Sequence, residues 1–211
     1  MNASPLRRAA PLILCLLCLV AALGGCRLPQ KSPPPRTWLL SPVAGAPDSD
    51  AFSLSLGVGP VDFPKYLDRR EIIERVGPNE LRANEYEVWG ESLQTNFQDT
   101  LSYNISVLVP GLGVVGFPWK GPVQVDYRLS MVVSRFDHDV PSGAIVLEAA
   151  WGLRRVSGGE SLATRTRTIR EPVQGSGYAA ITAAMSRAVE SLSREIAMGL
   201  AKLPERHRAA P

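Results

Sequence analysis

The chain has 211 residues, a formal net charge of +3 and 20% charged residues. Loss of Arg7 and Arg8 with a signal peptide would lower the net charge to about +1, which argues against the strongly basic surface of a nucleic-acid-binding domain. The length allows one domain with a hydrophobic core, together with an export signal and a tether.

Residues 1–25 have the parts of a lipoprotein signal peptide. Two arginines precede an apolar run from Leu12 to Leu23, which is too short for a transmembrane helix, and two glycines follow it. Leu23-Gly24-Gly25-Cys26 resembles the bacterial lipobox, so Cys26 is the predicted lipidation site and the predicted contact with the membrane. An ordinary signal peptide followed by an incidental cysteine is the alternative interpretation.

Residues 26–36 form the predicted tether between the lipid and the folded domain. They include four prolines, which favour an extended polyproline II path. Arg27, rather than an aspartate, follows the cysteine, and this predicts sorting to the outer membrane with the domain in the periplasm. The domain is expected over residues 37–203, and residues 204–211 are expected to be a disordered tail.

Apolar residues that alternate with polar or small ones predict four strands in the first half of the domain. Pro60 and Pro64 near the end of the second strand favour an edge position for it, because proline cannot donate to a strand ladder. The predicted strands are Thr37–Leu40, Phe52–Val61, Glu71–Val76 and Glu80–Ala83.

The period changes from two to about 3.6 after Glu87, which predicts an amphipathic helix from about Val88 to Leu108. Trp89 and Phe97 lie on its apolar side, and Gln98 lies on its polar side. The helix needs an apolar surface to pack on, and a sheet is the expected partner.

The second half predicts a three-stranded meander followed by another helix. Its strands are Val123–Val133, Ile145–Leu153 and Leu162–Arg170, its first turn is Asp137–Gly143, and its helix is Tyr178–Leu200. Strands and helices that each have one apolar face predict an α+β fold. We expect a two-layer sandwich, with a mainly antiparallel sheet and both amphipathic helices on one face.

The reactive residues form no recognisable catalytic or metal-binding arrangement. His138 lies in Asp137-His138-Asp139, where adjacent side chains cannot all reach one metal ion, and it is expected in a solvated turn. Gly111–Gly116 matches the GxGxxG pattern but precedes a strand, so it lacks the helix N-terminus that holds a pyrophosphate. We therefore expect no enzyme activity, no cofactor and no metal site.

The segment Val107–Trp119 is unusually apolar for a loop. Two interpretations remain open: it forms a strand edge that covers the core, or it contacts a partner subunit or a lipid. Its candidate contact residues are Val109, Leu112, Val114, Val115, Phe117 and Trp119.

A second candidate surface is cationic. Arg165 and Arg167 should share one face of their strand because side chains alternate, and Arg154 and Arg155 on the preceding strand belong to the same candidate surface. A solvated face is one interpretation, and pairing with acidic residues of a partner or with lipid phosphates is the other.

Several motifs together resemble the PqiC-type lipoproteins, the auxiliary lipoproteins of ABC-type intermembrane transport systems. Gly90 and Ser92 depart from the alanine and proline expected in that pattern. The resemblance covers most of Thr37–Leu203 and rests on Trp38-Leu39-Leu40, on Leu56-Gly57-Val58-Gly59-Pro60-Val61 with Pro64, on Tyr66-Leu67-Asp68-Arg69, on Trp89-Gly90-Glu91-Ser92-Leu93 and on Phe117-Pro118-Trp119.

This resemblance implies an outer-membrane-anchored adaptor of an ABC-type lipid transport system that supports membrane integrity. Its partner would be an MCE-type periplasmic component, with the ATPase and permease on other chains, and it could also form homo-oligomers. A stand-alone envelope lipoprotein that binds a hydrophobic ligand is the alternative. A closed apolar cavity between helices and sheet would favour that alternative.

Overall fold

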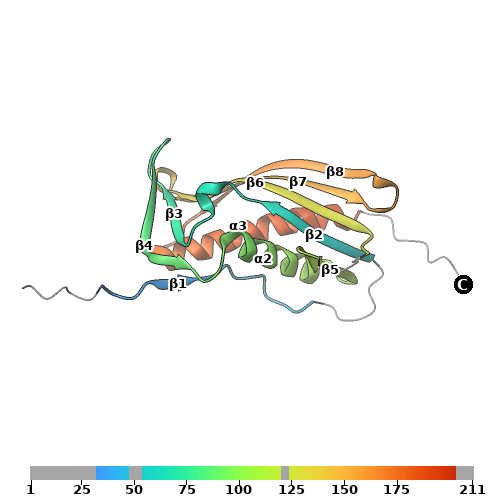
Figure 1. The fold of residues 1–211 in the computed structure, drawn as a ribbon, viewed down its shortest axis with the longest axis horizontal. Helices are drawn as coiled ribbons and strands as arrows, with labels where there is room; N and C mark the ends of the chain where they lie inside the picture. Colours follow the sequence, from blue (N-terminus) through green and yellow to red (C-terminus); the bar gives the residue numbers. More distant parts are fainter. Residues whose placement is uncertain (1–31, 48–53, 120–123, 203–211) are drawn as a thin grey trace, which may run out of the picture. The chain divides into compact units, whose positions relative to one another are not determined.

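The computed structural model describes residues 32–47, 54–119 and 124–202, so Cys26 and residues 204–211 lie outside the described part of the chain. The folded unit begins at Pro35. Within these ranges eight strands form one sheet, and helices α2 and α3 lie side by side on one face of it (Figure 1). The expected α+β class with two helices is confirmed.

In the described residues the elements follow the order that the sequence pattern predicts, except that a further strand follows the first helix; three short 3-10 helices lie in the connections. The first strand begins at Arg36, which the sequence pattern places in the tether. The strands are β1 (Arg36–Trp38), β2 (Leu54–Asp62), β3 (Glu71–Arg75), β4 (Leu81–Trp89), β5 (Leu112–Gly116), β6 (Tyr127–Asp139), β7 (Ala144–Arg155) and β8 (Ser161–Pro172), and the helices are α2 (Leu93–Leu108) and α3 (Gly177–Leu200).

Strand β6 joins the parts of the sheet. One side of it pairs with β7 from Tyr127 to Asp139, and β7 pairs in turn with β8. Its other side pairs with β2 and, near its end, with β3. Strand β5 lies beyond β2, and β1 lies beyond β4.

The expectation of a mainly antiparallel sheet is wrong. Four of the seven described strand pairs are parallel, namely β1 with β4, β2 with β5, β2 with β6 and β3 with β6. The three antiparallel pairs join consecutive strands, as the alternating pattern predicts. Parallel pairs instead need a crossover connection, and α2 lies in the connection that returns the chain from β4 to β5 beside β2.

Helix α2 begins five residues later than the periodicity predicts. Its N-cap is Ser92, whose hydroxyl accepts a hydrogen bond from the Thr95 amide at 3.1 Å, so the first helical residue is Leu93. Trp89 belongs to β4 and is buried there. Its spacing from Leu93 matched the helical period only by coincidence.

Two further expectations are corrected by the strand pairing. Strand β2 is not an edge, because β5 and β6 flank it, and Pro60 lies where the register with β6 shifts between Val58 and Val61. The shift leaves room for a residue that has no N–H to donate. His138 belongs to β6 rather than to a solvated turn, since the turn begins at Val140.

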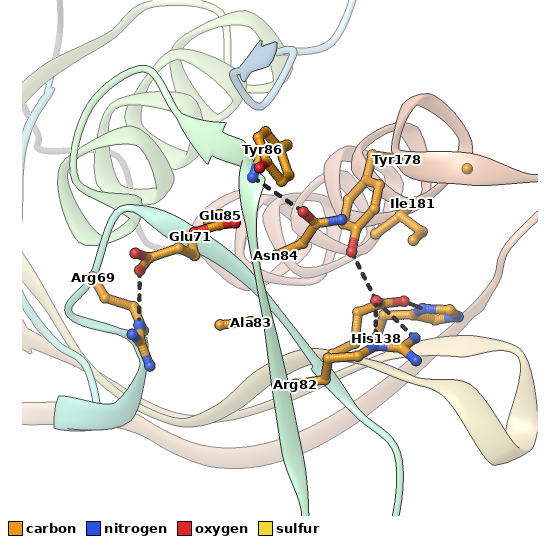
Figure 2. Close-up of a pocket in the computed structure, with 12 residues that line it drawn as sticks. Arg69, Glu71, Arg82, Ala83, Asn84, Glu85, Tyr86, His138, Tyr178 and Ile181 are labelled. Carbon is orange, nitrogen blue, oxygen red and sulfur yellow. Dashed lines mark hydrogen bonds and ion pairs between the residues drawn. The ribbon is translucent and has the colours of Figure 1, made fainter. Parts of the chain in front are cut away.

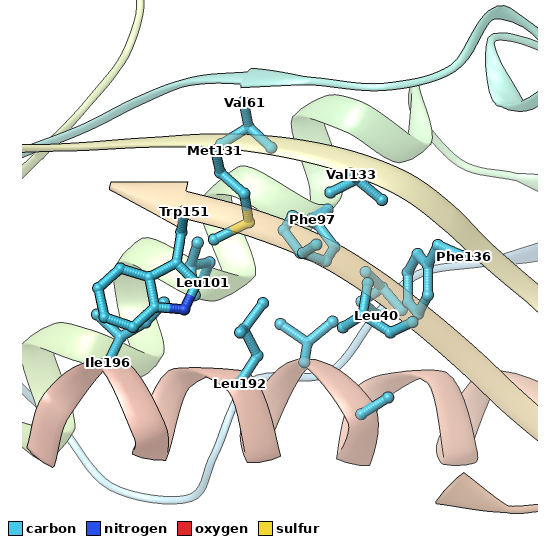
Figure 3. Close-up of a cluster of buried hydrophobic side chains, with 14 of the residues drawn as sticks. Leu40, Val61, Phe97, Leu101, Met131, Val133, Phe136, Trp151, Leu192 and Ile196 are labelled. Atoms are coloured by element: carbon cyan, nitrogen blue, oxygen red, sulfur yellow. The ribbon is translucent and has the colours of Figure 1, made fainter. Parts of the chain in front are cut away.

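The core lies between the sheet and the two helices (Figure 3). Phe97 from α2 is fully buried and makes edge-to-face contacts with Phe63 and Phe136 at centroid distances of 5.2 and 5.5 Å. Leu192 and Ile196 of α3 point towards Trp151 of β7 in Figure 3. Neither described helix is both long enough and apolar enough to cross a membrane.

Candidate interaction surface at the β5 edge

The apolar segment after α2 contains strand β5, which pairs with β2 in parallel from Leu112 to Gly116. The pairing brings Leu112 opposite Leu54 and Gly116 opposite Val58. In the part of the sheet that the structure describes, β5 has no partner on its other side. The strand-edge interpretation of this segment is therefore correct for its central part.

The six candidate contact residues of this segment divide between core and surface. Leu112 is buried, and Val109 and Val114 are half-buried against the hydrophobic cluster. Val115 and Phe117 are 37% and 41% exposed. We call the surface formed by Val115, Phe117 and Trp119 the β5 patch.

Two glycines of β2 position the aromatic residues of the β5 patch. A Cβ atom on Gly57 would lie 2.9 Å from Cζ2 of Trp119, and one on Gly59 would lie 2.5 Å from Cβ of Phe117. Gly59 also has φ +122°, a conformation that favours glycine. Two motifs that carry the family resemblance, Leu56–Val61 and Phe117–Trp119, are therefore neighbours in space.

The polar side of α2 also contributes to the β5 patch. Gln98 is buried, and its side-chain amide donates a hydrogen bond to the backbone carbonyl of Phe117. The Phe117 amide donates to the carbonyl of Val58 at 2.9 Å, and the Phe117 and Trp119 rings meet edge to face at 5.3 Å. The backbone of Phe117 is thus fixed from two sides while its ring stays exposed.

On the face of the sheet opposite the helices, Trp119 lies next to two arginines, Arg128 and Arg154. The Arg128 guanidinium lies 4.6 Å from the Trp119 ring centroid, a cation–π arrangement. Arg154 is the register partner of Arg128 in the β6–β7 pair and is exposed. Both arginines lie on this outer face because their neighbours Leu129 and Leu153 point into the core.

The predicted arginine cluster is divided between the two faces of the sheet. Arg165 is the register partner of Trp151, whose side chain enters the core, so Arg165 and Arg167 lie on the helix side of β8. Arg167 donates a 2.6 Å hydrogen bond to Glu195 of α3. Arg154 lies on the opposite face, and Arg155 forms an ion pair with Glu160 at 2.6 Å.

A separate surface cavity of about 860 Å³ lies beside the N-terminus of α3 (Figure 2). Its buried carboxylate, Glu74, accepts hydrogen bonds from Tyr178 at 2.8 Å and Arg82 at 3.0 Å, and it lies 3.0 Å from Nδ1 of His138. Burial by itself raises the pKa of Glu74, but these hydrogen bonds outweigh burial and hold that pKa below its usual value. Burial, followed by the Glu74 hydrogen bond, raises the pKa of Tyr178 to about 12.

A second buried carboxylate lies nearby in β6. Asp137 is fully buried and accepts hydrogen bonds from Arg135 at 2.8 Å and from Arg75 and Tyr66 at 3.1 Å. Burial and the adjacent Asp137 raise the pKa of the Tyr66 hydroxyl to about 12. Across the described ranges, no group of three or more His, Cys, Asp or Glu side chains is arranged to hold a metal ion. Through these contacts Glu74 links β3 to β4 and β6, and Asp137 links β6 to β3.

Sequence reasoning missed four residues of the candidate surface: Gly57, Gly59, Gln98 and Arg128. Glycine within a strand pattern indicates a close approach of another segment, and that signal could have identified the first two. The positions of Gln98 and Arg128 depend on where Phe117 and Trp119 lie, and no local pattern contains that information.

Comparison with solved structures identifies the same fold elsewhere. The chain is similar to the crystal structure of an uncharacterized protein, with a TM-score of 0.67 and 20% identity, over 80% of this chain and 99% of that chain. It is also similar to a crystal structure from Xanthomonas campestris, with a TM-score of 0.61 and 21% identity, over 76% of this chain and 92% of that one. At these identities the likeness shows the fold alone.

A comparison of sequences identifies the family. No curated protein matches the chain as a relative. A family model described as the ABC-type transport auxiliary lipoprotein component matches residues 38–197, which include the strands and helices from β2 through most of α3. The chain therefore belongs to the family of ABC-type transport auxiliary lipoprotein components, as the resemblance of its motifs to the PqiC-type lipoproteins implies.

Proposed function

We propose that the protein is an outer-membrane-anchored periplasmic adaptor of an ABC-type, MCE-associated system that moves lipids between membranes and supports membrane integrity. Lipid on Cys26 attaches it to the membrane, and the proline-rich residues 27–34 form the tether to the folded unit, which begins at Pro35. The protein works by contact rather than by catalysis. Its partner is the MCE-type periplasmic component, and further copies of the chain are a second class of partner.

The observation that carries this proposal is the β5 patch. Val115 and Phe117 are large apolar residues whose side chains stay exposed instead of entering the core. Leu112, in the same strand as Val115, is buried. Hydrogen bonds with Gln98 and Val58 hold the backbone of Phe117, and two glycines of β2 leave space for Phe117 and Trp119. Aromatic side chains such as that of Phe117 are enriched at the buried centre of protein interfaces.

The alternative, a stand-alone lipoprotein that binds a hydrophobic ligand, would require space between the helices and the sheet. That region holds a continuous cluster of side chains, including the fully buried Phe97, Phe136 and Leu192 (Figure 3). Filled packing supports the adaptor, because an internal ligand site needs a cavity of several hundred Å³, about the size of a small lipid.

Co-purification tests the proposal. The tagged lipoprotein is solubilised from membranes in neutral detergent, and its partners are identified by mass spectrometry. We expect an MCE-type component with the wild type and its loss with Val115→Asp combined with Phe117→Ser. Met198→Asp is the matched control, because Met198 is 63% exposed on α3, away from the patch. Equal recovery of the partner with both variants would remove the β5 patch from the interface.

A further inference from the structure

A groove on the face of the sheet opposite the helices carries a further inference. It has a volume of about 390 Å³ and is lined by Trp119, by residues of β2, β6 and β7, and by Ser161 at the start of β8. Ser130 contributes only a small side chain to the lining and Gly152 contributes none, and Gly59 lies at its β2 side. The groove therefore stays open next to the β5 patch, with which it shares Trp119.

Two arginines stand side by side in this groove. Arg128 and Arg154 are register partners in the β6–β7 pair, and both line the groove. Opposed residues in an antiparallel pair have Cβ atoms about 5 Å apart, and like charges in these positions are destabilising. Neither arginine forms an ion pair within residues 32–47, 54–119 and 124–202.

Arg128 is held in position but has an unused donor. Its guanidinium stacks on Trp119, and its Nε is buried without a hydrogen-bond partner in the described part of the chain. Asp126, two residues earlier, accepts hydrogen bonds from the amide and the hydroxyl of Ser55 at 2.9 Å each. A buried N–H without an acceptor is rare in folded proteins, so the fold holds this guanidinium in a position that leaves one of its own donors unpaired.

We propose that this groove binds the phosphate group of an anionic phospholipid headgroup. The planar donors of arginine match phosphate oxygens, and an anion between Arg128 and Arg154 would convert their repulsion into two attractive contacts. Val132, which is 54% exposed on the same face of β6, and Phe117 provide apolar surface near the groove. A ligand with an anionic end and an apolar end fits both features. This inference deepens the proposed function and rests on it, because it assigns headgroup recognition to a subunit of a lipid transport system.

Isothermal titration calorimetry of the detergent-solubilised lipoprotein tests the groove. The probes are dihexanoyl phosphatidylglycerol, dihexanoylglycerol, inorganic phosphate and a tetraglutamate peptide. We expect the phospholipid to bind most tightly and dihexanoylglycerol not to bind. Arg154→Gln should weaken phospholipid binding about tenfold through loss of a charge-assisted hydrogen bond, without lowering the melting temperature. Arg170→Gln, an exposed arginine of β8, is the control and should bind as the wild type does.

Each other outcome overturns part or all of the inference. Absence of phospholipid binding, or binding that neither Arg154→Gln nor Arg128→Gln weakens, would overturn the site. Equal affinity for inorganic phosphate would support the phosphate chemistry and overturn the lipid source. Tighter binding of tetraglutamate would assign the groove to an acidic protein segment instead. Because the measurement needs no transport partner, its failure can be distinguished from failure of the co-purification experiment.

Discussion

Trp119 lies over Gly57 so closely that a Cβ atom on residue 57 would be 2.9 Å from Cζ2 of the indole. The two residues belong to segments that are distant in the sequence, since Gly57 is in β2 and Trp119 follows β5. The same indole carries the Arg128 guanidinium on its face. The absence of a side chain at Gly57 thus sets the position of Trp119, which belongs to the β5 patch and also lines the groove that contains Arg128.

Gly57→Ala should therefore displace Trp119. The added methyl group overpacks this contact, and we expect a loss of about 1 to 3 kcal/mol in the free energy of unfolding. Thermal unfolding measures the loss, and tryptophan fluorescence reports the movement of the indole. Gly152→Ala is the control, because a Cβ atom there would meet nothing nearer than 3.8 Å. If both variants melt at the same temperature, Trp119 does not rest on Gly57.

Gln98→Ala should destabilise the domain although Gln98 lies on the polar side of α2. Removal of the Gln98 side-chain amide leaves the Phe117 carbonyl without that donor, and we expect the free energy of unfolding to fall by about 1 to 3 kcal/mol. Phe97→Ala, which empties a fully buried position, should cost about 3 to 5 kcal/mol. Chemical denaturation gives both values, and an unchanged midpoint for Gln98→Ala would show that Phe117 is held by β2 alone.

Glu74→Gln should lower the stability of the protein at neutral pH and should make that stability less dependent on pH in the acidic range. The pKa of Glu74 in the folded protein lies below the usual 4.5, so its stabilisation is present above that pH and is lost as the pH falls through the lowered pKa. Melting temperatures from neutral pH to about pH 3 should fall less steeply in the variant. Glu85→Gln, an exposed carboxylate beside the same cavity, should keep the steeper dependence of the wild type. Parallel curves for Glu74→Gln and the wild type would contradict the prediction.

Cys26→Ala should abolish lipid attachment, since only the cysteine sulfur can form the thioether to diacylglycerol. Labelling of cells with radioactive palmitate, followed by immunoprecipitation, checks this outcome. Cys15→Ala is the control, because Cys15 lies within the predicted signal peptide and its replacement should leave the label on the protein. Continued labelling of Cys26→Ala would remove the proposed anchor.

Local patterns in the sequence determined the number and type of most elements. Alternation identified the β3–β4 hairpin and the β6–β7–β8 meander, because neighbouring antiparallel strands need only period-two side chains and a turn between them. The apolar stripe of α3 predicted that helix from Tyr178 to Leu200 within one residue of its observed start. The motif residues also predicted the family, which the model match over residues 38–197 confirms.

Only the tertiary structure decided which segments pair in parallel and which side chains meet across the sheet. The pairing of β5 with β2 buries Leu112 and leaves Val115 exposed, although both are apolar residues of the same short segment. The register of β7 with β6 and β8 places Arg154 beside Arg128 and on the opposite face from Arg165. The local periodicity of the sequence indicates which residues of a strand lie on the same face. It contains no information about the partner strand, because a crossover connection can bring many different segments to the same position.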